Sequence, residues 1–476
     1  GQTNIDESML TGEPVPVPKS TGNEVSAGTL NKTGSVLYRA TRVGSDTALA
    51  RIIRMVRQAQ NTKPPIGRLA DAIAAVFVPV VMVIAFFAAL TWFSIGPEPR
   101  YVYAIVTAVT VLIIACPCAL GLATPMSVMV GIGKAAEAGV LIRNGEALQT
   151  ASQLTTMVLD KTGTITSGQP EVIEIDAHGD QTQVELLQLA ASLEANSEHP
   201  LAQAFLDAAG LQELELLTVS DFEAVEGQGI RGQIASQKLL LGNRRLVDAA
   251  GVGLNAEAVE SSERMAKNAW TPMFLVSDGQ LIAIFAVADP VKPESAEAIK
   301  RLQSDGLNVI MLTGDNRRTS EAVAREVGIT QVHAEVLPQD KKNHIADLQR
   351  QGERVGMVGD GINDAPALAL SHVGFALGTG TDVAIESADI TLMRGSLHGV
   401  ADAIEVSRAT MRNIRQNLFG AFVYNSVGIP IAAGLLYPLT GMLLNPIVAG
   451  TAMAFSSVTV VTNANRLRLF RFATTR

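Results

Sequence analysis

The sequence predicts a multidomain membrane protein in which four transmembrane α-helices accompany a cytosolic α/β domain. Three observations support this fold class. The chain has 476 residues, enough for several domains, and 47% of them are hydrophobic. Uncharged segments lie on either side of a long middle section, and they are long enough to cross a bilayer, which takes roughly 20 apolar residues. The middle section is polar and has a mixed α/β pattern.

The first two spans are expected within residues 69–133 and the last two within residues 416–465. A buried core helix would be shorter than these uncharged segments. Residues 437–441 break the last segment into a helical hairpin, and Asn445 and Pro446 predict the cap and first turn of its second helix. Basic residues flank the outer ends of the spans, so the positive-inside rule places both ends and the middle section in the cytosol.

The second span contains the only two cysteines, Cys116 and Cys118, with Pro117 between them. Proline cannot donate the backbone hydrogen bond that a helix requires, so the helix should unwind here and let both sulfur atoms reach one ion. The cysteines are too close in sequence to staple a fold, which excludes a disulfide framework. Thiolates select soft ions such as Cu(I) or Zn²⁺. Ordinary packing of two small buried cysteines is the alternative.

In the middle section, an apolar run at residues 155–159 ends at Asp160. A buried parallel strand would place this carboxylate at the sheet edge where ligands bind. Asp160 is then positioned to attack a phosphoryl group and carry it covalently. Thr162 and Gly163, which follow, offer a hydroxyl and a backbone N–H to an anion.

Two further strand ends and a lysine are expected to converge on Asp160. Residues 307–312 lead into Thr313, and residues 355–358 lead into a loop that is rich in carboxylates. Hard carboxylates suit Mg²⁺, and phosphoryl transfer needs a metal ion to neutralise charge. The expected roles are Mg²⁺ ligation by Asp160 and Asp360, support of those ligands by Asn363 and Asp364, and phosphoryl contacts from Thr313 and Lys341.

The segments 160–164, 313–315 and 357–366 resemble those of P-type ATPases. This resemblance implies a haloacid-dehalogenase-like phosphorylation domain at residues 134–170 and 285–410, in which Asp160 takes the γ-phosphoryl of ATP. It also implies an inserted α+β nucleotide-binding domain at residues 171–284. A partial, β-rich actuator domain is implied at residues 1–50, with Glu13 directing hydrolysis of the phosphoaspartate.

The inserted segment resembles the nucleotide domain of heavy-metal-transporting P-type ATPases. By this resemblance, Glu194 and His199 contact the adenine region, and Gly227 and Gly229 let the backbone approach the nucleotide. The remaining implied nucleotide-binding residues are Ile230, Gly242 and Asn243.

The last two spans resemble the Cu(I) branch of these pumps. The resemblance implies that Cys116 and Cys118 share the transported ion with four residues of the last two spans, namely Tyr424, Asn425, Met453 and Ser457. The thioether of Met453 favours a soft monovalent ion. The zinc and cadmium branch is known for a lysine and an aspartate in these spans, and both are absent here.

The sequence is therefore interpreted as part of an ATP-driven Cu(I) exporter that also accepts Ag(I), with ATP and Mg²⁺ as cofactors. The expected setting is a bacterial plasma membrane, with membrane lipid and a copper chaperone as partners, and an N-terminal part is expected to be missing. The net charge of -9 argues against a nucleic-acid partner. A Zn²⁺ or Cd²⁺ pump, a membrane-anchored phosphatase and a non-enzymatic metal-binding membrane protein are the alternatives.

Overall fold

The computed structural model divides the chain into two compact units, which we describe separately. One unit comprises residues 1–155, 352–356 and 368–476, and the other comprises residues 156–351 and 357–367. The structure describes all residues except 7–16, 27–28, 42, 45–46, 48–49, 51–52, 54–56, 58–61, 198–200, 226–227, 269, 316 and 473–476.

The first unit begins with a small antiparallel sheet. It lies within residues 1–50, where the sequence predicts a β-rich domain. Its strands lie in the order β2-β1-β3. Their bounds are β1 (Thr3–Asp6), β2 (Val17–Lys19) and β3 (Leu30–Gly34).

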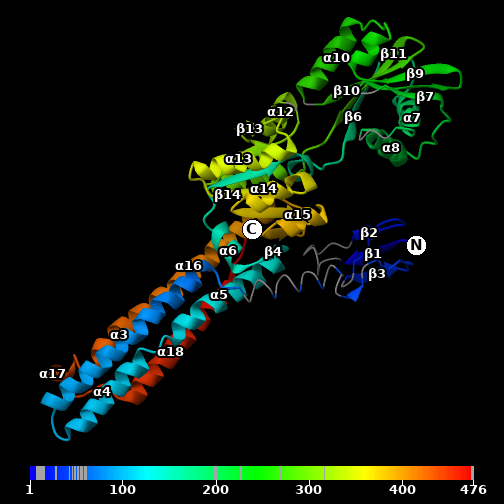
Figure 1. Cartoon of the computed structure of the whole chain (residues 1–476). Helices are drawn as coiled ribbons and strands as arrows, with labels where there is room; N and C mark the ends of the chain where they lie inside the picture. The colour runs from blue at the N-terminus through cyan, green and yellow to red at the C-terminus, as the bar shows by residue number, and fades with distance from the viewer. Residues whose placement is uncertain are drawn as a thin grey trace. The chain divides into compact units, whose positions relative to one another are not determined.

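The expected membrane part of this unit consists of helices (Figure 1). They are α3 (Pro65–Ile95), α4 (Arg100–Ile114), α5 (Cys118–Glu137), α16 (His398–Ala432), the short α17 (Tyr437–Thr440) and α18 (Pro446–Asn465). In the described part of the chain, three helical stretches are long and apolar enough to cross a membrane: α3, α4 together with α5, and the stretch that begins with α18.

The third expected span differs from its predicted form. It is the C-terminal half of α16, which starts at His398 rather than near residue 416. Helix α16 is not among these three stretches, and its C-terminal half contains the polar residues Asn417 and Asn425. Its C-terminal half nevertheless packs with the other spans, because Ala421 and Ile429 belong to apolar clusters shared with α3, α5 and α18. Other expected bounds are also displaced, since α3 begins at Pro65 and α5 continues to Glu137.

Small residues allow the membrane helices to approach closely. A side chain at Gly131 would collide with Thr410, and one at Gly428 would collide with Ile114. Such close backbone approach is typical of helix contacts in membranes. A buried polar network adds hydrogen bonds between α5, α16 and α18, through Ser127, Asn413, Asn417 and Asn463.

A seven-stranded sheet has the order β13-β12-β5-β14-β15-β16-β4. The pairs β12–β13, β12–β5 and β15–β16 are parallel, whereas β4 runs antiparallel to β16. The bounds are β4 (Val140–Ile142), β5 (Thr156–Asp160), β12 (Asn308–Leu312), β13 (Gln331–His333), β14 (Val355–Gly359), β15 (Val373–Leu377) and β16 (Ile390–Leu392). The helices along this section are α6 (Gly145–Ala151), α11 (Ser295–Ser304), α12 (Arg317–Val327), α13 (Pro338–Arg350), α14 (Ala365–Leu370) and α15 (Asp382–Ser387).

A six-stranded antiparallel sheet lies between β5 and β12 in the sequence, in the order β6-β11-β10-β9-β8-β7. The strands are β6 (Glu171–Ala177), β7 (Ser220–Val225), β8 (Gly229–Ile234), β9 (Gln237–Gly242), β10 (Thr271–Ser277) and β11 (Gln280–Ala288). Its two faces bury separate cores, one with α7 (Gln183–Glu194) and α8 (Ala202–Leu211), the other with α9 (Arg244–Ala249) and α10 (Ala256–Lys267). The predicted boundary between residues 284 and 285 falls inside β11.

Candidate active site and ion site

The candidate active site begins at Asp160, the last residue of β5. Strand β5 is apolar and fully buried, and its parallel register pairs Asp160 with Leu312 of β12. Thr313 therefore follows directly on the neighbouring strand. The carboxyl ends of parallel strands meet at one edge of a sheet, where open α/β folds bind ligands. The predicted strand ends at Asp160, Thr313 and Asp360 are thus confirmed.

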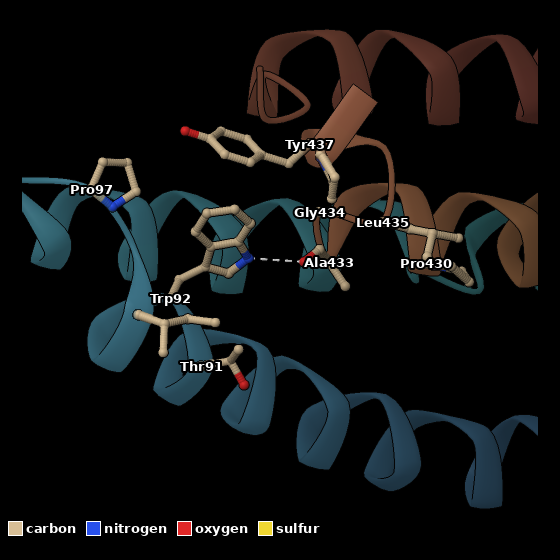
Figure 2. A pocket seen from close by; sticks show the side chains of 10 residues that line it. Thr91, Trp92, Pro97, Pro430, Ala433, Gly434, Leu435 and Tyr437 are labelled. Atoms are coloured by element: carbon tan, nitrogen blue, oxygen red, sulfur yellow. Dashed lines mark hydrogen bonds between the residues drawn. The ribbon is translucent and has the colours of Figure 1, made fainter. Parts of the chain in front are cut away.

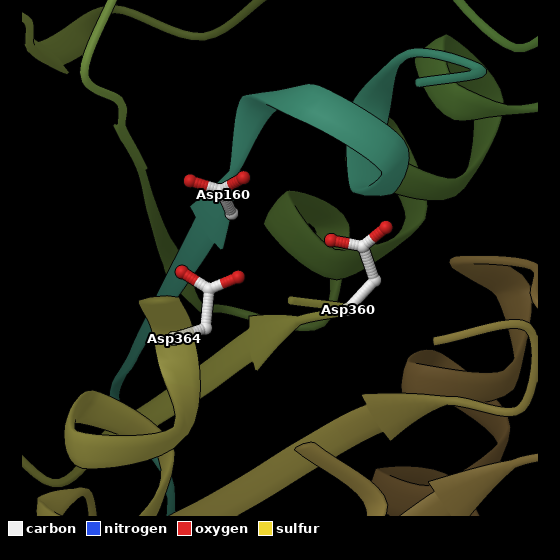
Figure 3. A group of neighbouring side chains, drawn as sticks. All are labelled: Asp160, Asp360 and Asp364. Carbon is white, nitrogen blue, oxygen red and sulfur yellow. The ribbon is translucent and has the colours of Figure 1, made fainter. Parts of the chain in front are cut away.

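Three carboxylates meet at this edge (Figure 3). Asp160, Asp360 and Asp364 each offer an oxygen, and these oxygens all lie within 4.8 Å of one another. Lys341, in the first turn of α13, donates from Nζ to Asp160 Oδ1 at 2.5 Å and to Asp364 Oδ1 at 2.7 Å. The buried lysine compensates part of the negative charge that the three carboxylates concentrate here.

Burial and mutual repulsion perturb this cluster. Burial, followed by the charge of Asp364, raises the pKa of Asp160 to about 7, although Lys341 opposes the shift. Burial and then Asp364 also raise the pKa of Asp360. For Lys341, burial disfavours the charged form, but Asp160 and Asp364 outweigh it and raise the pKa. The protein alone therefore leaves excess negative charge at the site, which a cation would relieve.

The donor set fits Mg²⁺. Three clustered carboxylates supply only hard oxygen ligands, which Mg²⁺ prefers. Asp364 is also engaged by Lys341 and accepts from the N–H of Gly361 at 3.3 Å, so it is suited to supporting the other two carboxylates. This arrangement agrees with the expected pairing of Asp160 with Asp360. Asn363, by contrast, is exposed in a short 3₁₀ helix, and its supporting role stays a prediction.

The loop after Asp160 fits closely against Asp360. Gly163 has φ 74°, and a Cβ added there would overlap the carboxylate of Asp360. Thr162 is exposed at the rim and accessible to a ligand. Thr164 is fully buried, and its hydroxyl has no hydrogen-bond partner among the described residues. These positions leave the loop free to offer backbone and hydroxyl groups to a phosphoryl group.

Sequence reasoning missed three residues that position this loop. Lys292 donates from Nζ to the carbonyl of Gly163 at 2.7 Å, and burial lowers its pKa. Lys161 forms an ion pair with Asp315. Asp289 accepts from the N–H of Gly168 at 2.8 Å. A weak signal was available, because Asp289 follows the apolar strand β11 as Asp160 follows β5.

The expected nucleotide-binding residues are described in part. Glu194 is buried at the end of α7, burial raises its pKa, and its Oε2 has no partner among the described residues. Gly229 has φ 147° and pairs with Gly242 across β8 and β9, where a Cβ on either glycine would collide with backbone. The other expected residues are Ile230, which is buried in the core, Asn243, which caps α9, and His199 and Gly227, which lie outside the described residues.

The predicted break in the second span is confirmed. Helix α4 ends at Ile114, and α5 begins at Cys118 with Pro117 as its N-cap. The unwound segment brings the two sulfur atoms together as a disulfide rather than as the expected free thiolates. A ring that encloses one intervening residue cannot staple distant segments, so the exclusion of a disulfide framework holds. Metal binding by both thiolates requires the reduced pair.

The expected ion ligands share part of one environment. Cys116 packs against the apolar cluster that contains Met453, which is buried. Asn425 is also buried, and its Oδ1 has no partner among the described residues. This oxygen is therefore available to a ligand. Ser457 is half-buried, whereas Cys118 and Tyr424 are exposed, so a common ligand set of all six residues stays a prediction. The expected Glu13 lies outside the described residues.

A sheet-edge aspartate with a buried lysine and further carboxylates is an arrangement suited to phosphoryl transfer, here in a chain with helices apolar enough to cross a membrane. A family model for the haloacid dehalogenase-like hydrolases matches residues 154–372, and one for the P-type ATPase actuator domain matches residues 1–57.

Known relatives narrow the class. A copper-exporting P-type ATPase of Vibrio cholerae serotype O1 is 54% identical over 98% of this chain and 51% of its own length. A probable copper-transporting ATPase, PacS, of Synechococcus elongatus is 55% identical over 99% of this chain and 63% of its own. The crystal structure of a zinc-transporting PIB-type ATPase in its E2.Pi state superimposes with a TM-score of 0.74 at 33% identity, over 98% of this chain and 75% of that one.

The chain belongs to the P-type ATPase family. It spans about half to two thirds of the length of these two curated relatives.

Proposed function

We propose that this chain carries the phosphorylation and ion-binding parts of an ATP-driven exporter of Cu(I), which also accepts Ag(I). The observation that carries the proposal is the pairing of two sites in one chain. One is the Asp160 cluster with Lys341 at 2.5 Å, and the other is the helix break that brings Cys116 and Cys118 together near Met453. The copper-exporting relative of Vibrio cholerae and the probable copper-transporting relative of Synechococcus elongatus support the choice of ion.

In the proposed cycle, an oxygen of Asp160 attacks the γ-phosphorus of ATP, a new O–P bond forms, and the bond to the β-phosphate oxygen breaks to release ADP. A bound Mg²⁺ would neutralise charge on the transferred group. Lys341 keeps Asp160 in the ionised, nucleophilic form by opposing the effect of burial on its pKa. Thr313, which is buried beside Asp160 at the sheet edge, contacts the phosphoryl oxygens.

The phosphoaspartate then changes the relative affinity of two states for the ion, which couples chemistry to alternating access. Residues 134–170 and 285–410 would act as the phosphorylation domain, residues 171–284 would hold ATP, and Glu13 in residues 1–50 would direct water to the phosphoaspartate. The expected setting is a bacterial plasma membrane with both ends of the chain in the cytosol, where a copper chaperone would deliver the ion.

Labelling with γ-³²P-ATP tests the chemistry. Acid-stable, hydroxylamine-labile label is expected on the reduced protein with Mg²⁺, and Asp160→Asn should abolish it while the fold persists. Label that survives this substitution would refute the assignment of the nucleophile. A non-enzymatic metal-binding protein would give no label at all.

Ion-stimulated ATP hydrolysis under reducing conditions tests the cargo. Cu(I) and Ag(I) should stimulate turnover, and Cys116→Ser or Cys118→Ser should remove the stimulation. Activation by Zn²⁺ alone would instead support a divalent-metal pump. Zinc is the ion that the structurally similar ATPase is named for transporting. Turnover that ignores both serine substitutions would favour a membrane-anchored phosphatase.

A further inference from the structure

A cavity lies where α3 ends and α16 turns into α17, and its residues are distant in sequence from the Asp160 cluster (Figure 2). Its volume is about 610 Å³, within the range of about 300–1,000 Å³ that is typical of small-molecule sites. Its lining is mainly apolar and includes Trp92, Ile95, Pro430, Leu435 and Tyr437. Neither the proposed phosphoryl transfer nor the proposed ion site uses these residues.

The wall of this cavity is built around Trp92. Its indole N–H donates to the carbonyl of Ala433 at 2.9 Å, which satisfies a backbone acceptor at the end of α16. Its ring makes an edge contact with Tyr437 at 4.7 Å and stacks on Tyr103 at 6.0 Å. Gly434 has φ 101°, and a Cβ there would collide with the indole. These contacts hold the indole in place on the sides that do not face the cavity, so this wall of the cavity is preformed.

The surface that continues from the cavity indicates its occupant. Helix α3 exposes a long uncharged apolar face. Only 11% of an apolar stretch of 18 residues in this helix is buried. Phe86, Phe87 and Phe93 are each more than half exposed on α3. Ile95, which is 80% exposed, and Leu435, which is 67% exposed, line the cavity itself. In a bilayer, hydrocarbon must cover this face, and Trp and Tyr concentrate where the hydrocarbon meets the headgroups.

We infer that the cavity beside Trp92 binds an acyl chain of a membrane phospholipid, inserted between the end of α3 and the turn after α16. The inference rests on the proposed membrane insertion of these helices but not on the identity of the ion or on the phosphorylation chemistry. The charge beside the cavity is balanced, since Arg100, the first residue of α4, pairs with Glu98 in the preceding loop at 3.2 Å. Recognition is accordingly assigned to the hydrocarbon chain rather than to an anionic headgroup.

The chain offers a direct probe, because Trp92 and Trp270 are its only tryptophans. Trp270→Phe leaves Trp92 as the sole indole. The protein would be placed in phosphatidylcholine bilayers that contain increasing fractions of the same lipid brominated on its acyl chains. A chain bound beside the indole should quench fluorescence along a saturable curve. Half-maximal quenching is expected at a bromolipid fraction at least twofold lower than for a tryptophan that only meets bulk lipid.

A filling variant and a matched control decide whether the cavity is responsible. Thr91→Phe with Leu435→Phe adds rings to the cavity lining and should weaken quenching at least twofold. Ser94→Phe is the control, because Ser94 is exposed on the same helix and bonds to Leu90, as Thr91 bonds to Phe87, but it does not line the cavity. It should leave quenching unchanged.

Two results would overturn the inference. One is equal quenching in the filling variant and the control, which would indicate contact with bulk lipid only. The other is strong quenching by aqueous acrylamide with none by bromolipid in protein that floats with the vesicles, which would indicate a water-filled cavity. Loss of ATP labelling with saturable bromolipid quenching intact would reject the proposed function and leave the lipid site standing.

A second measurement tests the inference if the filling variant folds poorly. Returning phosphatidylcholine to detergent-purified protein should raise its melting temperature, and the gain should be smaller in the filling variant than in Ser94→Phe. An equal gain in both would contradict a lipid site in this cavity.

Discussion

Gly163→Ala should disable phosphorylation while leaving the protein folded. Gly163 adopts φ 74°, a conformation that L-residues rarely take, and an added Cβ would overlap the carboxylate of Asp360. Lys292 donates to the carbonyl of Gly163, and Thr164 and Ile165, which follow it in the loop, are buried. The loop therefore cannot yield easily, and we expect Asp360 to move instead.

Two separate costs follow from this geometry. Placing alanine in a left-handed conformation costs roughly 1–2 kcal/mol of folding free energy. For a domain of about 150–250 residues, each kcal/mol lowers the melting temperature by roughly 2–4 °C. Displacing Asp360 by about 1 Å from the carboxylate cluster should in addition cost on the order of 10²-fold in phosphorylation rate.

Gly306→Ala is the matched control. Gly306 has φ 85°, and a Cβ there meets no atom within 4 Å, so this variant shares the backbone cost without touching the site. Thermal unfolding should shift similarly in both variants, whereas Mg²⁺-dependent phosphorylation by ATP should fall only in Gly163→Ala. Equal labelling rates in the two variants would refute the proposed contact between the loop and Asp360.

Three further outcomes are expected. Lys341→Met leaves two buried carboxylates without their cation and should cost about 3–5 kcal/mol, with part of the loss recovered at low pH as Asp160 becomes protonated; a pH-independent loss measured by denaturant unfolding would contradict this. Asp360→Asn should remove the stabilisation by Mg²⁺, which is about 2.7 kcal/mol at 100 times Kd for a single site; an unchanged Mg²⁺-induced shift in melting temperature would exclude Asp360 as a ligand. Burial raises the pKa of Glu194 above its ordinary 4.5, so its stabilising contribution is present below pH 4.5 and is lost as the pH rises through the folded-state pKa. Glu194→Gln should therefore be more stable than wild type at pH 8, with the advantage shrinking toward pH 4; parallel stability–pH curves would show that Glu194 is not perturbed.

The convergence of three candidate-site residues could be predicted from sequence because each ends or follows a short apolar strand. Parallel strands bring their carboxyl ends to one edge, so Asp160, Thr313 and Asp360 converge once β5, β12 and β14 belong to one sheet. Lys341 was predictable as a partner but not as a helical residue, since a proline can precede either a loop or a first helical turn. Its bonds to both Asp160 and Asp364 depend on how α13 packs, which no local pattern specifies.

Other features depend on long-range contacts that the sequence pattern does not contain. Lys292 lies 129 positions from Gly163. No sequence motif around Lys292 indicates that it bonds to the loop after Asp160. The start of α16 at His398 was missed because its polar half and its membrane half form one continuous helix with no proline or glycine break between them. The absence of charged residues identified the C-terminal half alone, since it reflects composition rather than helix continuity.

The carboxylate cluster and the helix break offer opposite kinds of ligand, which is why the proposed function assigns different ions to them. At Asp160 the protein concentrates hard oxygen atoms and supplies one lysine, so excess negative charge remains for a hard divalent cation. At Cys116 the surroundings are apolar and include the thioether of Met453, so a divalent ion would have little opposite charge beyond the thiolates. A soft monovalent ion demands less charge compensation there. Under the proposed function, the same physical argument that favours Mg²⁺ at the sheet edge therefore favours Cu(I) at the helix break.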